Sequence, residues 1–175
     1  ISQERLEDCI NSDLANNFGN LCQRVTAFAE KNCKGKIPKN IEFNNDDLKI
    51  LNKFKDNSEI IRKKIDELDL NFYIEFIVNS LFETNKYFND QEPWKKKDDV
   101  KRLNTIVYTT LEIVRKISFM LYPIIPQSAI NALKIFSINE SEIEYSSINN
   151  HNFLVGGDII NKIDILFKKI EKNND

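Results

Sequence analysis

Three polar side chains recur at four-residue spacing early in the chain: Asn16, Asn20 and Arg24. At about 100° per residue these positions form one stripe along a helix. Asparagine competes for backbone hydrogen bonds inside a helix, so its repetition there is unusual. Arginine carries donors in a fixed fork, and asparagine both donates and accepts. The stripe therefore predicts hydrogen bonding to a planar polar edge, such as that of an exposed base.

The second chemical feature is a polar loop, YFNDQEPWKKK, which contains the only tryptophan. Trp94 follows Pro93, and an indole beside a rigid proline is a good stacking platform for an unpaired base. Basic side chains near it are candidates for phosphate contacts: Lys95, Lys96, Lys97, Lys101 and Arg102. An alternative interpretation is that Trp94 caps the core and the lysines are only solvated.

The polar stripe must be positioned by a helix that buries its neighbouring face. Apolar residues cluster on that face: Leu14, Phe18, Leu21, Val25 and Phe28. We expect this helix to run from near the N-terminus to about Lys34 and to end at Gly35. The stripe should therefore lie beside the core and not inside it.

Further helices are predicted along the chain. One begins after Asn44 and Asn45 and has a possible break at residues 56–58. Another has Asp69 as its N-cap and ends near Tyr87.

The clearest helix pattern runs from Asp98 to Tyr122, with apolar residues every three or four positions. It stops before Pro123, because proline disfavours helical angles in the residue that precedes it. Pro126 suits the first turn of the next helix. An amphipathic segment at residues 159–170 is compatible with a last short helix. We predict an all-α fold, an antiparallel bundle of about five helices over residues 1–175, with a tail from about residue 137.

Composition limits the possible functions. The 25 basic and 27 acidic residues nearly cancel, so any nucleic-acid contact must use a local patch. No apolar run is long enough to cross a bilayer, and the first residues are unlike a secretory signal. We therefore expect a cytoplasmic protein without a membrane partner. The chain lacks an initiating methionine and is expected to be a segment of a longer protein.

Catalytic and metal-binding patterns are missing from the sequence. The cysteines Cys9, Cys22 and Cys33 have no CxxC spacing, and His151 is expected to be a lone surface residue. Acidic pairs such as Asp46 and Asp47 stand at helix starts, where they complement the helix dipole. We expect no metal, no cofactor and no catalysis in this segment.

Several motifs together carry a family resemblance. INSDLANNFGNLCQRVTAF, NKYFNDQEPWK, LYPIIPQSA and the closing DILFKKIEKN occur in that order. The chain thus resembles the C-terminal anticodon-binding domain of methionyl-tRNA synthetase. Two positions depart from the family: Asn89, where aspartate is frequent, and Lys168, where proline is usual.

The resemblance implies a helical bundle that reads the CAU anticodon of methionine tRNA. By family position, Asn20 and Arg24 would contact bases, chiefly the first cytosine. Trp94 with Pro93 would shape the same pocket, and Asn16 would support it one turn earlier.

The resemblance also implies a catalytic domain in cis that uses ATP and magnesium to join methionine to tRNA. The HIGH and KMSKS motifs of that domain are missing here, and DNA is not an expected partner. Two alternatives remain open. One is the anticodon domain of another class I synthetase. The other is a helical protein-interaction module that uses the 100–121 helix.

Overall fold

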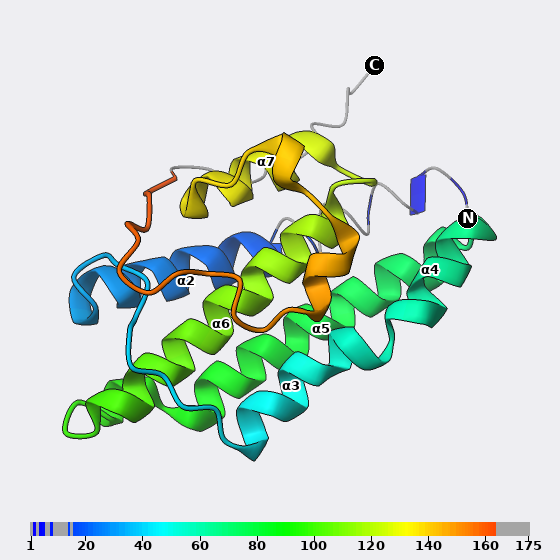
Figure 1. The fold of residues 1–175 in the computed structure, drawn as a ribbon. Coiled ribbons are helices and arrows are strands. Elements are labelled where there is room, and N and C mark those ends of the chain that lie inside the picture. Colours follow the sequence, from blue (N-terminus) through cyan, green and yellow to red (C-terminus); the bar gives the residue numbers. More distant parts are fainter. Residues whose placement is uncertain (1, 3, 6–7, 9–13, 15, 164–175) are drawn as a thin grey trace.

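The computed structural model describes residues 2, 4–5, 8, 14 and 16–163. This part of the chain is a bundle of helices, as predicted, and its only sheet-like feature is an isolated antiparallel bridge between Lys36 and Ile159 (Figure 1). The α-helices are α2 (Asn16–Asn32), α3 (Asn45–Asp56), α4 (Ser58–Asp66), α5 (Leu70–Gln91), α6 (Val100–Leu121) and α7 (Pro126–Leu133). The short 3-10 helices are η2 (Pro93–Lys95), η3 (Lys134–Phe136), η4 (Glu140–Glu142) and η5 (Tyr145–Asn149).

Helix boundaries follow the predicted capping chemistry. Asn44 and Asp47 form a reciprocal capping box at the start of α3. Asn57 separates α3 from α4, as the possible break indicated. Asp69 caps α5 by accepting from the backbone N–H of Phe72 at 3.2 Å. α5 then extends past Tyr87, the predicted end, as far as Gln91.

Helix α6 is the centre of the bundle. Every residue from Thr105 to Leu121 is buried, and α6 contacts α2, α3, α5, α7 and η5. Figure 1 shows α5 and α6 running side by side, with α7 across one end. The interpretation of this helix as a partner surface is therefore wrong, because its apolar pattern is used by core packing.

Helix α2 presents two different faces, as its sequence predicts. The side chains of Phe18, Leu21 and Val25 are fully buried, as is that of Leu14 just before the helix, and Phe28 packs partly buried against the same core. The opposite stripe reaches solvent, since Asn16 and Asn20 are exposed and Arg24 is half-buried.

Residues 137–163 form an irregular strap that crosses the bundle over α6 and reaches the end of α2 (Figure 1). Its apolar anchors in the core are Ile138, Ile148, Leu154 and Ile160. At its far end the N–H of Ile160 donates to the carbonyl of Gly35 at 2.8 Å. Residues 159–163 are not helical, while the rest of the predicted last helix, with Lys168, lies outside the described residues, as does Cys9.

Charged side chains of α6 hold this strap from inside the core. Glu112 and Arg115 are fully buried and paired at 2.5 Å. The guanidinium of Arg115 donates to the carbonyls of Ser147 and Asn150 at 3.1 and 2.8 Å. Glu112 accepts from the N–H of Leu154 at 2.6 Å. The strap's backbone groups are thus satisfied by charges that would otherwise be isolated in an apolar core.

His151 is not the surface residue that its polar surroundings in sequence predicted. Its ring is half-buried, with Nδ1 at 3.2 Å from Nζ of Lys116 and Nε2 at 3.0 Å from Oδ1 of Asn52. Burial lowers the pKa of His151 to about 4. This histidine links the strap to α3 and α6, which only the tertiary structure reveals.

No helix in the described part of the chain is long and apolar enough to cross a membrane.

Replacing Glu112 with glutamine should destabilise the fold by about 3–5 kcal/mol, because it leaves the buried Arg115 without its carboxylate. Urea unfolding at neutral pH measures this loss. Lys86→Ala, which breaks the exposed Lys86–Asp90 pair, is the control and should leave the unfolding midpoint unchanged. Equal midpoints for the two variants would contradict a structural role for the buried pair.

The free energy of unfolding should rise with pH between 7 and 9, because burial lowers the pKa of Lys116 to about 7 from its ordinary 10.5. The range stops at 9, because Cys33 begins to lose its proton in the unfolded chain near that pH and then acts in the opposite direction. Between the two lysine pKa values the unfolded chain binds more protons than the folded one, so deprotonation favours folding. Urea unfolding at several pH values measures the rise. Lys116→Met should flatten it, and an unchanged slope in that variant would exclude Lys116 as the cause.

Candidate functional site

The arginine of the polar stripe lies in a cluster with two aromatic rings. The guanidinium carbon of Arg24 is 4.7 Å from the centre of the Phe88 ring and 5.6 Å from that of Trp94. The two ring centres are 6.1 Å apart, and the ring planes are inclined at 55°. These three side chains come from α2, α5 and η2, so the fold joins the two motifs that the sequence singled out.

A hydrogen bond orients Arg24 within this cluster. Its Nη2 donates to Oδ1 of Asn89 at 2.5 Å. Asn89 is exposed and neutral, so it directs the guanidinium without cancelling its charge. In the described part of the chain no carboxylate forms an ion pair with Arg24. The other N–H groups of the Arg24 guanidinium are available to a ligand.

Trp94 sits on a loop that we call the Trp94 loop, residues 92–99. Glu92 begins it in the left-handed region, with φ of 49°, and Pro93 is buried at the first position of η2. The indole itself is 40% exposed. Trp94 packs on Phe88, as the core-capping interpretation predicts, and the rest of the indole remains exposed.

The asparagines of the stripe occupy positions before Arg24 on the exposed face of α2. Asn20 is one turn away, at roughly 6 Å along the helix axis, and Asn16 is two turns away. Both side chains are exposed. Asn20 therefore extends the polar edge beside Arg24, and Asn16 lies further out.

The basic candidates near Trp94 differ in how their charges are used. Lys95 pairs with Glu92 at 3.3 Å, and Lys101 pairs with Glu42 at 2.5 Å. Within residues 16–163, Lys96 and Lys97 form no ion pair.

Arg102, another of the predicted phosphate contacts, is bound to partners inside the domain. Its guanidinium makes two hydrogen bonds to the buried carboxylate of Asp47, at 2.7 and 2.9 Å, and one to Oε1 of Gln91 at 2.6 Å. Because these acceptors occupy the fork, the geometry favours a structural role over the predicted phosphate contact. Asp47, expected only at a helix start, is its partner.

Phe88 and Asn89 complete the cluster, and sequence reasoning gave neither of them a contact with Arg24. Phe88 is buried and also meets Phe28 edge-on, with ring centres 5.7 Å apart. The available signal was the helical spacing from Thr84 to Phe88, which continues the buried face of α5 past its predicted end.

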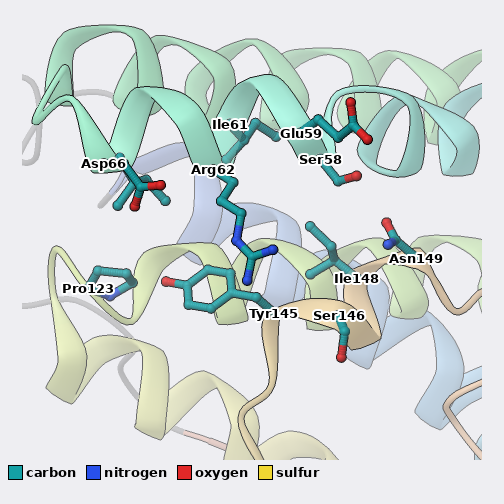
Figure 2. A pocket seen from close by; sticks show the side chains of 11 residues that line it. Ser58, Glu59, Ile61, Arg62, Asp66, Pro123, Tyr145, Ser146, Ile148 and Asn149 are labelled. Atoms are coloured by element: carbon teal, nitrogen blue, oxygen red, sulfur yellow. The ribbon is translucent and has the colours of Figure 1, made fainter.

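A separate cavity of about 490 Å³ lies between α4 and η5 (Figure 2). Arg62 extends from α4 toward the ring of Tyr145, and the apolar side chains of Ile61 and Ile148 also line the cavity. Pro123, at the far end of α6, also lines it. Lys116 of α6 donates to the carbonyl of Ile148 in the cavity wall, and at about 1.5 Å per residue Lys116 lies roughly 24 Å along the helix from its start beside the Trp94 loop. None of the predicted site residues lines the cavity.

Comparison with known families identifies the kind of domain that carries these surfaces. Residues 37–175 match the family model described as the anticodon binding domain of methionyl tRNA ligase. The chain belongs to this methionyl-tRNA ligase family. It is the anticodon-binding part, and the matched residues include the Trp94 loop but not α2.

Relatives of known name agree with this assignment. The methionine–tRNA ligase of Brucella suis is 36% identical over 148 residues, which are 84% of this chain and 29% of that enzyme. The ligase of Thermotoga maritima is 31% identical over 97% of this chain and 27% of its own length. This second match extends over most of α2, which lies outside the residues matched by the family model.

Solved structures of the same family share the fold. The free form of Mycobacterium tuberculosis methionyl-tRNA synthetase superimposes with a TM-score of 0.85 at 28% identity, covering 98% of this chain and 35% of that one. The same enzyme in complex with methionyl-adenylate gives a TM-score of 0.84 at 29% identity, over 95% of this chain and 33% of that one. This chain therefore spans about a third of the length of these relatives.

Arg24→Ala should cost about 1 kcal/mol or less in stability, because its ring contacts and its hydrogen bond lie near the surface. Leu21→Ala, one turn away on the buried face, should cost about 2–5 kcal/mol. Urea unfolding of the two variants checks the difference. A loss for Arg24→Ala as large as that for Leu21→Ala would make Arg24 a structural residue.

Proposed function

We propose that this anticodon-binding domain reads the CAU anticodon of methionine tRNA at the cluster of Arg24, Phe88, Asn89 and Trp94. The observation that supports it most is the guanidinium of Arg24, which is oriented by a neutral acceptor and stacked beside a half-open indole. Such a site offers a flat apolar face and directed donors side by side. Single-stranded bases are recognised by this combination of stacking and edge contacts.

Arg24 and Asn20 are the proposed readers of the first cytosine. The carbonyl and ring nitrogen of cytosine accept hydrogen bonds, which suits the donors that Asn89 leaves free on Arg24. Asn20 can both donate and accept one turn away. Asn16 would support the same polar edge, and Pro93 would fix the backbone from which Trp94 projects.

Lys96 and Lys97 are the proposed phosphate contacts nearest to Trp94, since in the described part of the chain their charges are not paired. Lys95 and Lys101 would exchange Glu92 and Glu42 for a phosphate. Both exchanges are inexpensive, because exposed ion pairs contribute little.

The whole protein is proposed to be a cytoplasmic methionine–tRNA ligase, with residues 1–175 as one anticodon-binding domain. A catalytic domain in cis would use ATP and magnesium to activate methionine and transfer it to the tRNA. Within this segment we propose no cofactor, metal, membrane or DNA contact. The names and lengths of the relatives support this proposal.

The chain should bind an RNA stem-loop with the CAU anticodon about 5- to 150-fold more tightly than one in which uridine replaces the first cytosine. This range corresponds to the ~1–3 kcal/mol of one good bidentate base contact. Arg24→Ala should bring the two affinities close together. Trp94→Ala should weaken both by a similar factor, because stacking is largely insensitive to the base. Fluorescence polarisation of a labelled stem-loop measures each affinity.

Arg62→Ala is the matched control, because it removes one exposed arginine from the far end of the bundle. It should leave the ratio of the two affinities unchanged. Equal affinity of the unmodified chain for both stem-loops would overturn the specific function. A loss of discrimination in Arg62→Ala as large as that in Arg24→Ala would show that net charge, and not the cluster, is responsible.

A further inference from the structure

A buried carboxylate lies behind the Trp94 loop, at the start of α3. Asp47 has no exposed surface, and its two oxygens accept from four donors. One is the backbone N–H of Asn44 at 2.9 Å, two are the Arg102 nitrogens described above, and the last is the hydroxyl of Tyr87. The carboxylate therefore joins the start of α3 to the end of α5 and the start of α6.

Arg102 also closes the loop on itself. Its Nη2 donates to Oε1 of Gln91 at 2.6 Å, and Gln91 is the last residue of α5. Residues 91 and 102 flank the Trp94 loop on its two sides, so one guanidinium connects both of its ends. We call the set of Gln91, Asp47 and Arg102 the loop base.

Beyond this base, the backbone hydrogen bonds of the loop are local, while Pro93 is buried and η2 packs against α6. These bonds include those from Lys96 N–H to the Pro93 carbonyl and from Asp99 N–H to the Lys96 carbonyl, both at 3.0 Å. Trp94 touches the bundle through Phe88 and Arg24 and is 40% exposed. The position of the indole thus depends on how firmly the two loop ends are held.

We propose that Asp47 and Arg102 are positioning residues for anticodon binding, which hold the Trp94 loop so that the indole is oriented before RNA arrives. This proposal rests on the proposed function of the Trp94 cluster. An ordered loop has less conformational entropy to lose when a base stacks on it, so the ion pair adds to affinity without touching the RNA.

The electrostatics of the loop base keep it formed near neutral pH. Burial alone would raise the pKa of Asp47, but hydrogen bonds from Arg102, Tyr87 and Asn44 together hold that pKa below its ordinary value. A carboxylate with a lowered pKa stabilises the fold above its ordinary pKa, and this contribution is lost as pH falls through the lowered value.

Trp94 is the only tryptophan in the sequence, so its fluorescence reports the loop directly. Asp47→Asn and Arg102→Lys should each lower the fluorescence anisotropy of Trp94 and raise its quenching by iodide, in the folded chain without RNA. Lysine keeps the charge of Arg102 but cannot make the paired contact. Affinity for the CAU stem-loop should fall on the order of ten-fold.

Two control variants separate loop positioning from general stability. Glu112→Gln breaks another buried ion pair of α6, about 15 Å along the helix from Arg102. At a pH and temperature where this variant stays folded, the quenching of Trp94 should be unchanged. Lys101→Met removes an exposed charge next to Arg102 and should also leave the quenching unchanged.

Gln91→Ala tests the loop base more mildly. It keeps the Asp47–Arg102 pair and should raise the quenching of Trp94 to a smaller extent than Asp47→Asn or Arg102→Lys.

Unchanged anisotropy and quenching in Asp47→Asn, Arg102→Lys and Gln91→Ala would overturn the proposal. An equal rise in quenching for Glu112→Gln would also overturn it, because any loss of stability would then suffice. An unmodified chain that binds neither stem-loop would overturn the proposed function instead, while the fluorescence of Trp94 would still decide whether the loop base positions the loop.

Discussion

The burial of α6 on all sides is the constraint on which the other elements depend. From Thr105 to Leu121 this helix must be covered by partners on every side, and α2, α3, α5, α7 and the strap supply that cover. Because the strap has little regular structure, its carbonyls need donors from elsewhere. Arg115 and Lys116 provide them from inside α6, so the central helix organises both the apolar core and the irregular segment that closes it.

At the other end of α6 a buried charge again holds an irregular segment, which there is the Trp94 loop. There the buried charge is a carboxylate, and its arginine partner reaches the last residue of the preceding helix. In both places a buried ion pair fixes backbone that no regular hydrogen-bond pattern would fix. Such pairs often add little net stability, but removing one member leaves an expensive unpaired charge. Their contribution here is to define where the flanking segments lie.

Much of this structure follows from local patterns. The caps at Asn44 and Asp69, the break at Asn57 and the two faces of α2 all depend on residues a few positions apart, which a sequence displays directly. The contacts of Arg102 with Asp47 span 55 positions, and those of His151 with Asn52 span 99. No periodicity carries such pairings, because they arise only when helices pack.

The candidate site shows the same division between local and distant information. The stripe on α2 and the loop around Trp94 were each visible alone, and the family resemblance placed them together. The ring of Phe88 between them was missed because α5 was expected to end near Tyr87, although the helical spacing from Thr84 predicts a buried residue at this position. Nor could the sequence indicate which basic residues remain available: Arg102 and Lys97 look alike until the buried carboxylate is located.

Helix α6 also has a mechanical consequence, because it is one continuous rod that joins the Trp94 loop to the turn at Pro123. Closely packed interiors resist compression, so such a rod transmits a displacement and does not absorb it. The first turn of α6 and the Tyr122–Pro123 corner are therefore parts of one stiff element, roughly 33 Å apart. One helix thus fixes the spacing between the Trp94 loop and that corner.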